Sequence, residues 1–253
     1  MSLIAGLGPA ALLAVFAVYF VAGAVKGVLG FALPLVSVAL LPFLVPVETA
    51  LALNGVVLFF TNLVQIRAAG DSAAAAGRAW PVVAGMIPAV PVGTLLVTSI
   101  APATLSILLG AFILIFAALS LTKPNLRTPE TRRVPIGLAT GGVSGVVGAL
   151  TSAPGPIFVG YVVSLSLPRA LYMGTLGCIM ASFGLILSLS FWSAGAVGRT
   201  ELLLGLLSVA PASLGFLAGN RLGDRIPAES FRRLVLAALA LLACLMIQRG
   251  LAG

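Results

Sequence analysis

The chain is a succession of long apolar stretches separated by short polar loops. Most of the stretches contain about 20 residues, the length at which an α-helix spans a hydrocarbon core of roughly 30 Å. Their bounds are Pro9–Val45, Val47–Ile66, Trp80–Ile100, Pro102–Leu121, Val134–Leu167, Ala170–Ser190, Glu201–Gly219 and Glu229–Gln248. The pattern predicts an all-α integral membrane protein with little mass outside the bilayer.

Two of the stretches, Pro9–Val45 and Val134–Leu167, are too long for one crossing and contain residues that break helices. The first is interrupted near Gly27–Pro34 and the second near Gly148–Pro156. Such breaks leave backbone amides without partners, and these groups must then face protein, water or a ligand. We predict a hairpin or a pair of short helices at each broken stretch.

The two broken stretches also match each other, which indicates an internal repeat. Glycines recur at an offset of 118 residues in the pairs Gly23 and Gly141, Gly27 and Gly145, and Gly30 and Gly148. The offset is 122 for Pro46 and Pro168 and for Gly55 and Gly177, and 125 for Pro102 and Pro227. A slowly drifting offset is typical of a duplicated module with small loop insertions. The predicted division is a first membrane repeat over 1–121, a linker over 122–133 and a second repeat over 134–253.

Loop charge predicts how the two repeats are oriented. Basic residues gather in three loops, namely Arg67 and Arg78, then Lys123, Arg127, Arg132 and Arg133, then Arg221, Arg225, Arg232 and Arg233. The positive-inside rule places these loops in the cytoplasm, and the uncharged turns at 100–102 and 191–198 outside. The turn near Pro46 is then outside and its equivalent near Pro168 inside. We therefore expect two inverted repeats in the inner membrane, each a hairpin plus three helices, with both termini outside, an arrangement typical of secondary transporters.

Composition excludes several other classes of protein. Hydrophobic residues make up 60% of the chain and charged residues only 8%. Soluble domains carry about 25% charged residues. The net charge of +8 is interpreted as a topology signal and an affinity for anionic lipid headgroups, so no nucleic-acid partner is expected. Cys178 and Cys244 lie in apolar segments and the chain has no histidine, so no metal site, cofactor or structural disulfide is expected.

Lys26 is the most informative single residue, because it lies inside an apolar run that otherwise carries no charge. A lysine at membrane depth costs roughly 2.5–3.5 kcal/mol on insertion scales and is rarely kept without a partner or a water-filled cavity. We predict that its ammonium group binds a small anion. The alternative is that Lys26 reaches the interface or pairs with Glu48.

Further site candidates come from the two breaks and from one polar helix face. The predicted substrate-binding residues beside Lys26 are Gly27, Gly30, Phe31, Asn54, Ser144, Gly148, Leu150, Thr151, Ser152, Ala153 and Pro154. Hydroxyl groups and free amides at a helix break suit an oxyanion, although they also serve simply to cap helices. Asn54, Thr61 and Gln65 share one helix face and either line a path or hold helices together. The substrate is expected at the midplane between Gly27–Phe31 and Leu150–Pro154.

The Gly-x-x-x-Gly-x-x-Gly run at Gly23–Gly30, followed by prolines and repeated in a second half of equal length, resembles the TauE/SafE sulfite exporter family from about Val18 to Met246. This resemblance implies movement of sulfite, sulfonates or related small sulfur-containing anions, with export as the favoured direction.

An enzymatic function has little support, because the chain lacks histidine, paired acids within a segment and any serine–base arrangement. The expected partners are a small anionic substrate and membrane lipids, and the chain is a candidate homodimer. Two alternatives stay open, namely uptake of an anion such as sulfate or thiosulfate, and a role as a membrane assembly factor that transports nothing.

Overall fold

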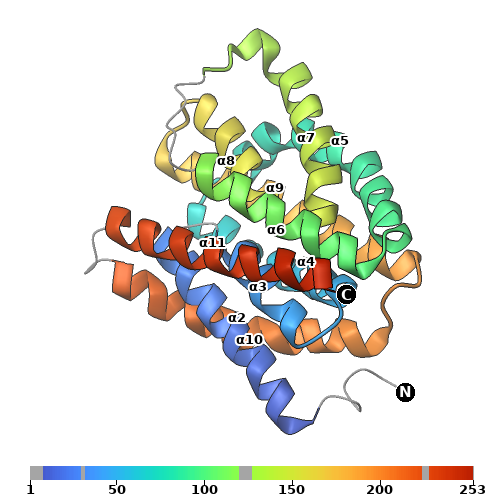
Figure 1. Ribbon diagram of the computed structural model, residues 1–253. Helices are drawn as coiled ribbons and strands as arrows, with labels where there is room; N and C mark the ends of the chain where they lie inside the picture. The colour runs from blue at the N-terminus through green and yellow to red at the C-terminus, as the bar shows by residue number, and fades with distance from the viewer. Residues whose placement is uncertain (1–7, 30–31, 120–126, 224–227, 253) are drawn as a thin grey trace.

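The computed structural model describes residues 8–29, 32–119, 127–223 and 228–252, and these residues form helices without any strand (Figure 1). The helices are α2 (Pro9–Leu29), α3 (Leu33–Leu40), α4 (Val47–Ala69), α5 (Ser72–Ser99), α6 (Pro102–Leu119), α7 (Arg133–Thr151), α8 (Gly155–Ser164), α9 (Arg169–Ser193), α10 (Arg199–Gly223) and α11 (Ala228–Ala252), with short 3₁₀ turns η1 (Leu41–Phe43) and η2 (Glu130–Arg132). Among the described residues, seven helices are long and apolar enough to cross a membrane, and three apolar helices are shorter. The predicted all-α membrane class is confirmed.

Both predicted breaks are present in the helices. The chain leaves α2 after Leu29 and re-enters a helix at Leu33, and it leaves α7 after Thr151 and re-enters at Gly155. The hydroxyl of Tyr161 in α8 donates a hydrogen bond to the carbonyl of Arg133 at the start of α7 (3.3 Å), so α7 and α8 form a hairpin. Both breaks fall inside the predicted intervals, since α2 ends at Leu29 and α7 ends at Thr151.

Helix α5 begins eight residues before the predicted apolar stretch, at Ser72 instead of Trp80. The side chain of Asp71 caps this end by accepting a hydrogen bond from the amide of Ala74 (2.9 Å), a common device at helix N-termini. A run of alanines follows, which favours a helix by propensity although it adds little hydropathy. Hydropathy alone therefore places the start of α5 too late.

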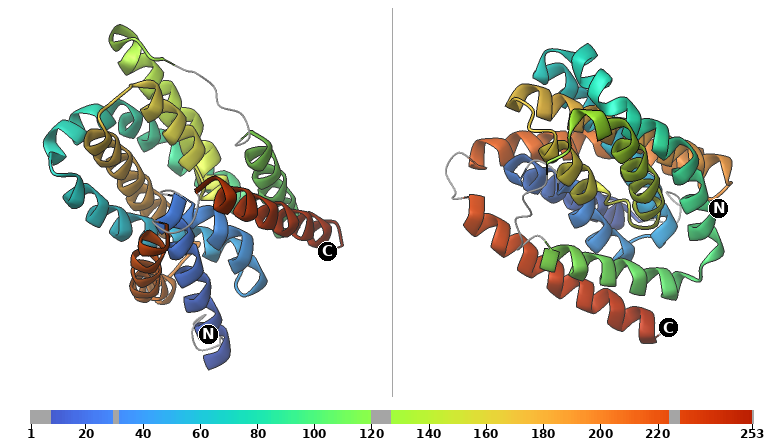
Figure 2. Two further views of the ribbon diagram at one scale, coloured as in Figure 1. Left: turned by 90° about the vertical axis from the view of Figure 1, so that its left-hand side faces the viewer. Right: turned by 90° about the horizontal axis from the view of Figure 1, so that it is seen from above.

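The two halves of the chain interlock and do not form separate bodies. The most extensive helix contacts are α2 with α10, α5 with α7, α4 with α9 and α6 with α11, and each pair takes one helix from each half. The pair α6 and α11 lies side by side in Figure 1 and in the right-hand view of Figure 2. In chain order, α2 to α6 of the first half correspond to α7 to α11 of the second. When each helix is replaced by its equivalent in the other half, the pair α2–α10 becomes α7–α5, and the pairs α4–α9 and α6–α11 stay the same.

Glycine contacts give the direction of each pair. Helices α4 and α9 are antiparallel, because Gly55 faces Ser188 whereas Gly177 faces Ile66. Helices α6 and α11 are likewise antiparallel, whereas α2 runs parallel to α10 and α5 runs parallel to α7. An inverted duplication requires that equivalent helices which pair with each other be antiparallel. The inverted repeat stays a prediction, and these directions support it.

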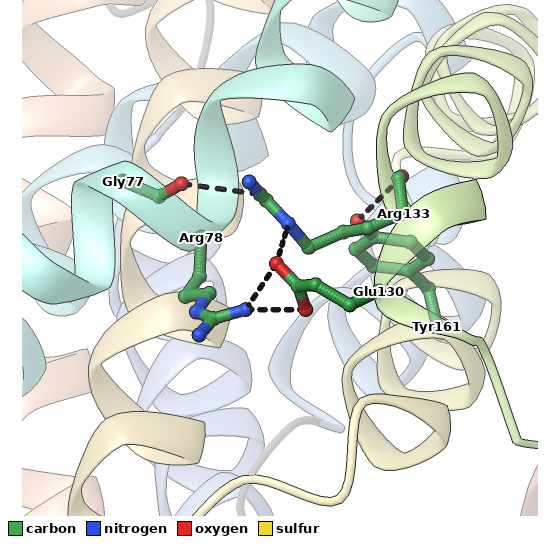
Figure 3. A network of polar contacts seen from close by, with 5 residues as sticks. All are labelled: Gly77, Arg78, Glu130, Arg133 and Tyr161. Carbon is green, nitrogen blue, oxygen red and sulfur yellow. Dashed lines mark hydrogen bonds and ion pairs between the residues drawn. The ribbon is translucent and has the colours of Figure 1, made fainter.

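Polar contacts bring together three segments that the charge pattern placed on one side, namely the start of α5, residues 128–133 and the end of α8. Glu130 accepts hydrogen bonds from Arg78 (2.7 Å) and from Arg133 (2.9 Å), and Arg133 also donates to the carbonyl of Gly77 (3.2 Å) (Figure 3). The amide of Thr128 donates to the carbonyl of Ser164 (2.9 Å), so the turn before Pro168 lies at the same end.

A second group of turns is joined through the last helix. Arg249 in α11 donates to the carbonyl of Pro42 (3.0 Å), in the turn that leads to Pro46. Residues 101–103 line the same cavity as this turn. Which of the two groups faces the cytoplasm stays a prediction.

The adjacent glycines Gly141 and Gly142 in α7 provide a test of the helix packing. A Cβ atom at Gly141 would meet the backbone of Val82 and Gly85 in α5, whereas a Cβ at Gly142 would meet nothing within 4 Å. Gly141→Ala should therefore destabilise the protein by about 1–3 kcal/mol, and Gly142→Ala should be neutral or stabilising by up to about 1 kcal/mol. Thermal unfolding in detergent checks this, and equal effects of the two changes would contradict the close α5–α7 packing.

Cysteine labelling in membrane vesicles tests the orientation of the two loop groups. Single cysteines at the exposed positions Thr131 and Ala170 should label from one side, and those at Phe43 and Ala101 from the other, with Cys178 and Cys244 replaced beforehand. Positive-inside topology places the first pair in the cytoplasm. Labelling of Phe43 and Ala170 from the same side would remove the basis for inverted repeats.

Candidate anion-binding site

Close packing of α2 against α10 determines where Lys26 lies. Gly23 and Gly27 on α2 face the backbone of Ala212 and Phe216, so that a Cβ atom at either glycine would overlap α10. Gly215 and Gly219 on α10 have the same relation to α2. Small residues at spacings of four let membrane helices approach at backbone contact. Lys26 is thereby held in the last turns of α2, beside α4 and the ring of Phe216.

The Lys26 ammonium group is buried and has neutral oxygen acceptors. Its side chain is 3% exposed. Its Nζ donates to Oδ1 of Asn62 (3.2 Å) and to Oγ1 of Thr61 (3.3 Å), and it lies 5.8 Å from the centroid of the Phe216 ring. The ring face adds a cation–π attraction. The ammonium group is therefore enclosed by protein, and its depth in the membrane stays a prediction.

Both acceptors are held in place by α4 itself. The hydroxyl of Thr61 donates to the carbonyl of Val57 (2.7 Å), and Nδ2 of Asn62 donates to the carbonyl of Leu58 (2.7 Å). Their oxygens are thus directed toward Lys26, whose ammonium group has three hydrogens and uses two. Neutral oxygens orient the ammonium group but leave its charge uncompensated.

Pairing of Lys26 with Glu48 does not occur. Glu48 is in the first turn of α4. Thr61 follows it thirteen residues later, and this separation corresponds to about 20 Å along a helix. Within the part of the chain that the structure describes, ion pairs involve only Glu130 with its two arginines. The site thus holds a positive charge without a counter-charge among the described residues.

A second polar cluster lies earlier on α4, around Asn54. Oδ1 of Asn54 lies 2.7 Å from the hydroxyl of Ser37 and 3.1 Å from that of Tyr19, and all three side chains are fully buried. Nδ2 of Asn54 has no hydrogen-bond partner among the described residues. Turning the amide over would only exchange the unpartnered donor for an unpartnered acceptor. A buried amide group without a partner is costly and is a candidate contact for a ligand.

The second break, Thr151–Pro154, is buried and is joined to α4. Ser152 has a left-handed backbone (φ 51°), which is unusual for a residue other than glycine. Its hydroxyl donates to the carbonyl of Leu51 (3.0 Å). The hydroxyl of Thr151 accepts from the amide of Ala153 (3.2 Å) and donates to the carbonyl of Val147 (2.7 Å). The Thr151 hydroxyl therefore caps the break and the Ser152 hydroxyl joins it to α4, and their role in anion binding stays a prediction.

The polar clusters lie at different levels along α4. Ser152 contacts α4 at Leu51, Ser37 and Tyr19 contact it at Asn54, and Lys26 contacts it at Thr61. Ten residues separate Leu51 from Thr61, which corresponds to about 15 Å along the helix axis. The structure does not bring Lys26 and the second break to one point. It places them at two levels of one helix, with Asn54 between them.

A comparison with known protein families matches nearly the whole chain. The family described as Sulfite exporter TauE/SafE matches residues 15–246, which include all or most of every helix named above. The chain belongs to the TauE/SafE family. No curated protein and no solved structure matches it. The resemblance inferred from the glycine pattern is thereby confirmed, and TauE/SafE is a family of transporters and not of enzymes.

The remaining predicted site residues of this TauE/SafE protein lie in the second half of the chain or outside the described residues. Ser144 is buried and donates to the carbonyl of Thr140 in its own helix, and Gly148 contacts Phe183 and Pro154. Leu150 is half-buried, and Ala153 is buried. Gly30 and Phe31 lie outside the described residues. The role of all these residues in substrate binding stays a prediction.

The polar residues on α4 divide between the two interpretations that the sequence left open. Nε2 of Gln65 donates to the carbonyl of Met173 in α9 (3.1 Å), so Gln65 holds two helices together. Thr61 contacts Lys26 and lies in the candidate site.

Three residues of the candidate site were not recognised from the sequence, namely Tyr19, Ser37 and Asn62. Each lies within a largely apolar helix, and the contacts to Asn54 or Lys26 join positions 17 to 36 residues apart. Asn62 follows Thr61 directly, so this pair of adjacent polar residues was the one available signal.

Proposed function

We propose that the protein is a secondary transporter or facilitator that moves a small sulfur-containing anion, such as sulfite or an organosulfonate, out of the cell across the inner membrane. The observation that carries the proposal is the buried Lys26 ammonium group, which has two neutral acceptors and no carboxylate partner among the described residues. A lysine of this kind is costly to keep in a membrane unless it serves a function.

A small oxyanion would supply what the Lys26 site lacks. Opposite unit charges about 4 Å apart attract by about 4 kcal/mol at an effective dielectric constant of about 20. Hydrogen bonds to charged groups contribute about 1.5–3 kcal/mol each. Thr61 and Asn62 keep the ammonium group oriented before the anion arrives, so that little order has to be gained on binding.

The unpartnered amide of Asn54 supports a path along α4. It lies between the level of Lys26 and the level of Ser152, in a cluster that carries no charge. An anion moving along α4 would exchange a charged contact for neutral donors, which bind it more weakly and allow release. With inverted repeats, rearrangement of the two hairpins would open this path to each side in turn.

The membrane potential is sufficient to drive the proposed export. Among the described residues, every acidic one stands in a loop or near a helix end, and these residues are Glu48, Asp71, Glu130, Glu201 and Glu229. These residues therefore provide no coupling carboxylate deep in a helix. A potential that is negative inside favours outward movement of an anion by about 2.3 kcal/mol per charge for each 100 mV or so.

The first functional test removes the charge of Lys26. Lys26→Ala should lower anion binding by at least about tenfold, because a charge-assisted contact is lost. Lys26→Met should do the same while leaving thermal stability unchanged or raised, because it removes a buried charge that lacks a counter-charge. Lys26→Arg keeps the charge and should retain part of the activity. The measurements are sulfite and sulfonate flux in proteoliposomes and the melting temperature of each variant.

Two outcomes of the Lys26 test would contradict the proposal. Normal flux in Lys26→Ala would remove Lys26 from the path. A wild-type protein that moves none of sulfite, sulfate, thiosulfate or organosulfonates would favour the assembly factor over the transporter. Flux that is faster inward than outward at zero potential would favour uptake.

A second test places a negative charge at the Asn54 cluster. Asn54→Asp keeps the shape of the side chain and should slow anion flux at mildly alkaline pH, because the new carboxylate repels the substrate. Flux should recover as the pH is lowered and the carboxyl group is protonated. Thr175→Val is the matched control, since the Thr175 hydroxyl is equally buried and also has no partner among the described residues. Equal flux in wild type and Asn54→Asp at alkaline pH would show that no anion passes Asn54.

A further inference from the structure

A cavity of about 710 Å³ lies at the Pro46 end of α4, away from the Lys26 site. Its walls come from the turn between α3 and α4, from the start of α6 and from the end of α11. Most of the lining is apolar, and the polar side chains in it are those of Glu48, Ser106 and Arg249. A cavity of this size has room for a small organic anion with some of its water.

Arg249 is an exposed residue at the wall of the cavity, where it has one hydrogen bond and one aromatic neighbour. One terminal nitrogen donates to the carbonyl of Pro42 (3.0 Å), and the guanidinium carbon lies 5.5 Å from the centroid of the Phe43 ring. A guanidinium group has five N–H donors, and the Pro42 contact needs only one. Such a group is well suited to oxyanions, because two of its N–H groups can bind two oxygens together.

The helices around the cavity reinforce the charge of Arg249. Helices α4 and α6 both begin at its wall, at Val47 and Pro102, and helix N-termini carry a partial positive charge. Two groups oppose this effect, namely Glu48 in the first turn of α4 and the C-terminal end of α11, which carries a partial negative charge. Arg249 and Glu48 should therefore act on an anion in opposite directions.

We propose that this cavity is a second binding site for a small oxyanion of the sulfonate type, with Arg249 as its principal ligand. The proposal rests on the proposed transport function, because the cavity lies on the line of α4 followed by the path. Glu48 at its wall is one helical turn from Leu51, where the second break contacts α4. An anion leaving the Asn54 cluster at this end would meet the cavity next.

The alternative is that Arg249 has a purely structural role and only holds α11 against the turn before α4. Arg249→Lys separates the two roles. It keeps the positive charge, but a lysine cannot reproduce the forked geometry or the stacking on Phe43. The attraction of an anion by the positive charge survives this change. The structural attachment of α11 through Pro42 and Phe43 does not.

The experiment places a single cysteine at Ser106, which lines the cavity, in a protein with Cys178 and Cys244 replaced and purified in detergent. Its labelling rate is measured with an anionic methanethiosulfonate (the sulfonatoethyl reagent) and a cationic one (the trimethylammonioethyl reagent), each divided by its rate with a free thiol. We expect the normalised rate of the anionic reagent to exceed that of the cationic one, so that the anionic-to-cationic ratio of the two rates is above one. Sodium methanesulfonate should slow its reaction more than sodium gluconate does at equal ionic strength.

Variants of the two lining charges then decide the assignment. Arg249→Gln should lower the anionic-to-cationic ratio by about threefold or more, and Glu48→Gln should raise it by a similar factor. Arg249→Lys should keep most of the ratio. Arg199→Gln removes the same charge from an exposed residue that is not part of the lining, and it should leave the ratio unchanged. A ratio that is insensitive to Arg249→Gln, or that falls equally in Arg249→Lys, overturns the proposal.

These outcomes are separate from those of the flux measurements. A normal ratio and normal protection by methanesulfonate in a protein without flux would leave the cavity site standing and reject transport. Normal flux with no protection at Ser106 would reject the cavity site alone.

Discussion

The buried ammonium group of Lys26 is the constraint on which the candidate site depends. A positive charge in the membrane interior is costly, and the hydrogen bonds to Thr61 and Asn62 reduce that cost without neutralising the charge. The protein could avoid the cost with an apolar residue at this position, or offset it with a carboxylate on α4. It does neither within the described residues. The electrostatic attraction of the uncompensated ammonium group is therefore available to an anionic ligand. In a TauE/SafE protein, such a ligand is the expected substrate.

Glycine packing makes the arrangement possible. At Gly23 and Gly27 the backbone of α2 touches that of α10, and at Gly141 and Gly145 the backbone of α7 approaches α5. Because these contacts join opposite halves of the chain, each broken segment is held by a helix of the other half. Because each broken segment is held separately, the two segments can contact α4 at different levels along its axis and do not have to meet at one point.

The sequence predicted the helical class and both breaks, because these depend on composition and on glycine and proline. It did not predict the residue at which each helix ends. Glycine lowers helix propensity by about 1 kcal/mol in isolation, but at Gly27, where α10 approaches closely, α2 stays helical and ends at Leu29, inside the predicted interval Gly27–Pro34. Tyr19, Ser37 and Asn62 were missed for a related reason, since only tertiary packing brings them to Asn54 and Lys26. The cavity at Arg249 depends on three separate segments and has no local signal in the sequence.

The two halves have the same order of long and short helices but differ in chemistry, and this difference would give the proposed path a direction. At the repeat offsets of 118 and 122 residues, Lys26 corresponds to Ser144 and Thr61 corresponds to Phe183. Phe183 is fully buried and packs edge-on against Phe158 at 6.1 Å, so the second half has an aromatic cluster where the first half has its charged site. An anion would therefore be held most strongly near the Thr61 end of α4 and more weakly toward the Leu51 end. If the Thr61 end is the cytoplasmic one, as loop charge predicts, the strongest site faces the compartment from which an exporter must collect a dilute substrate, and the weaker contacts lie on the side of release.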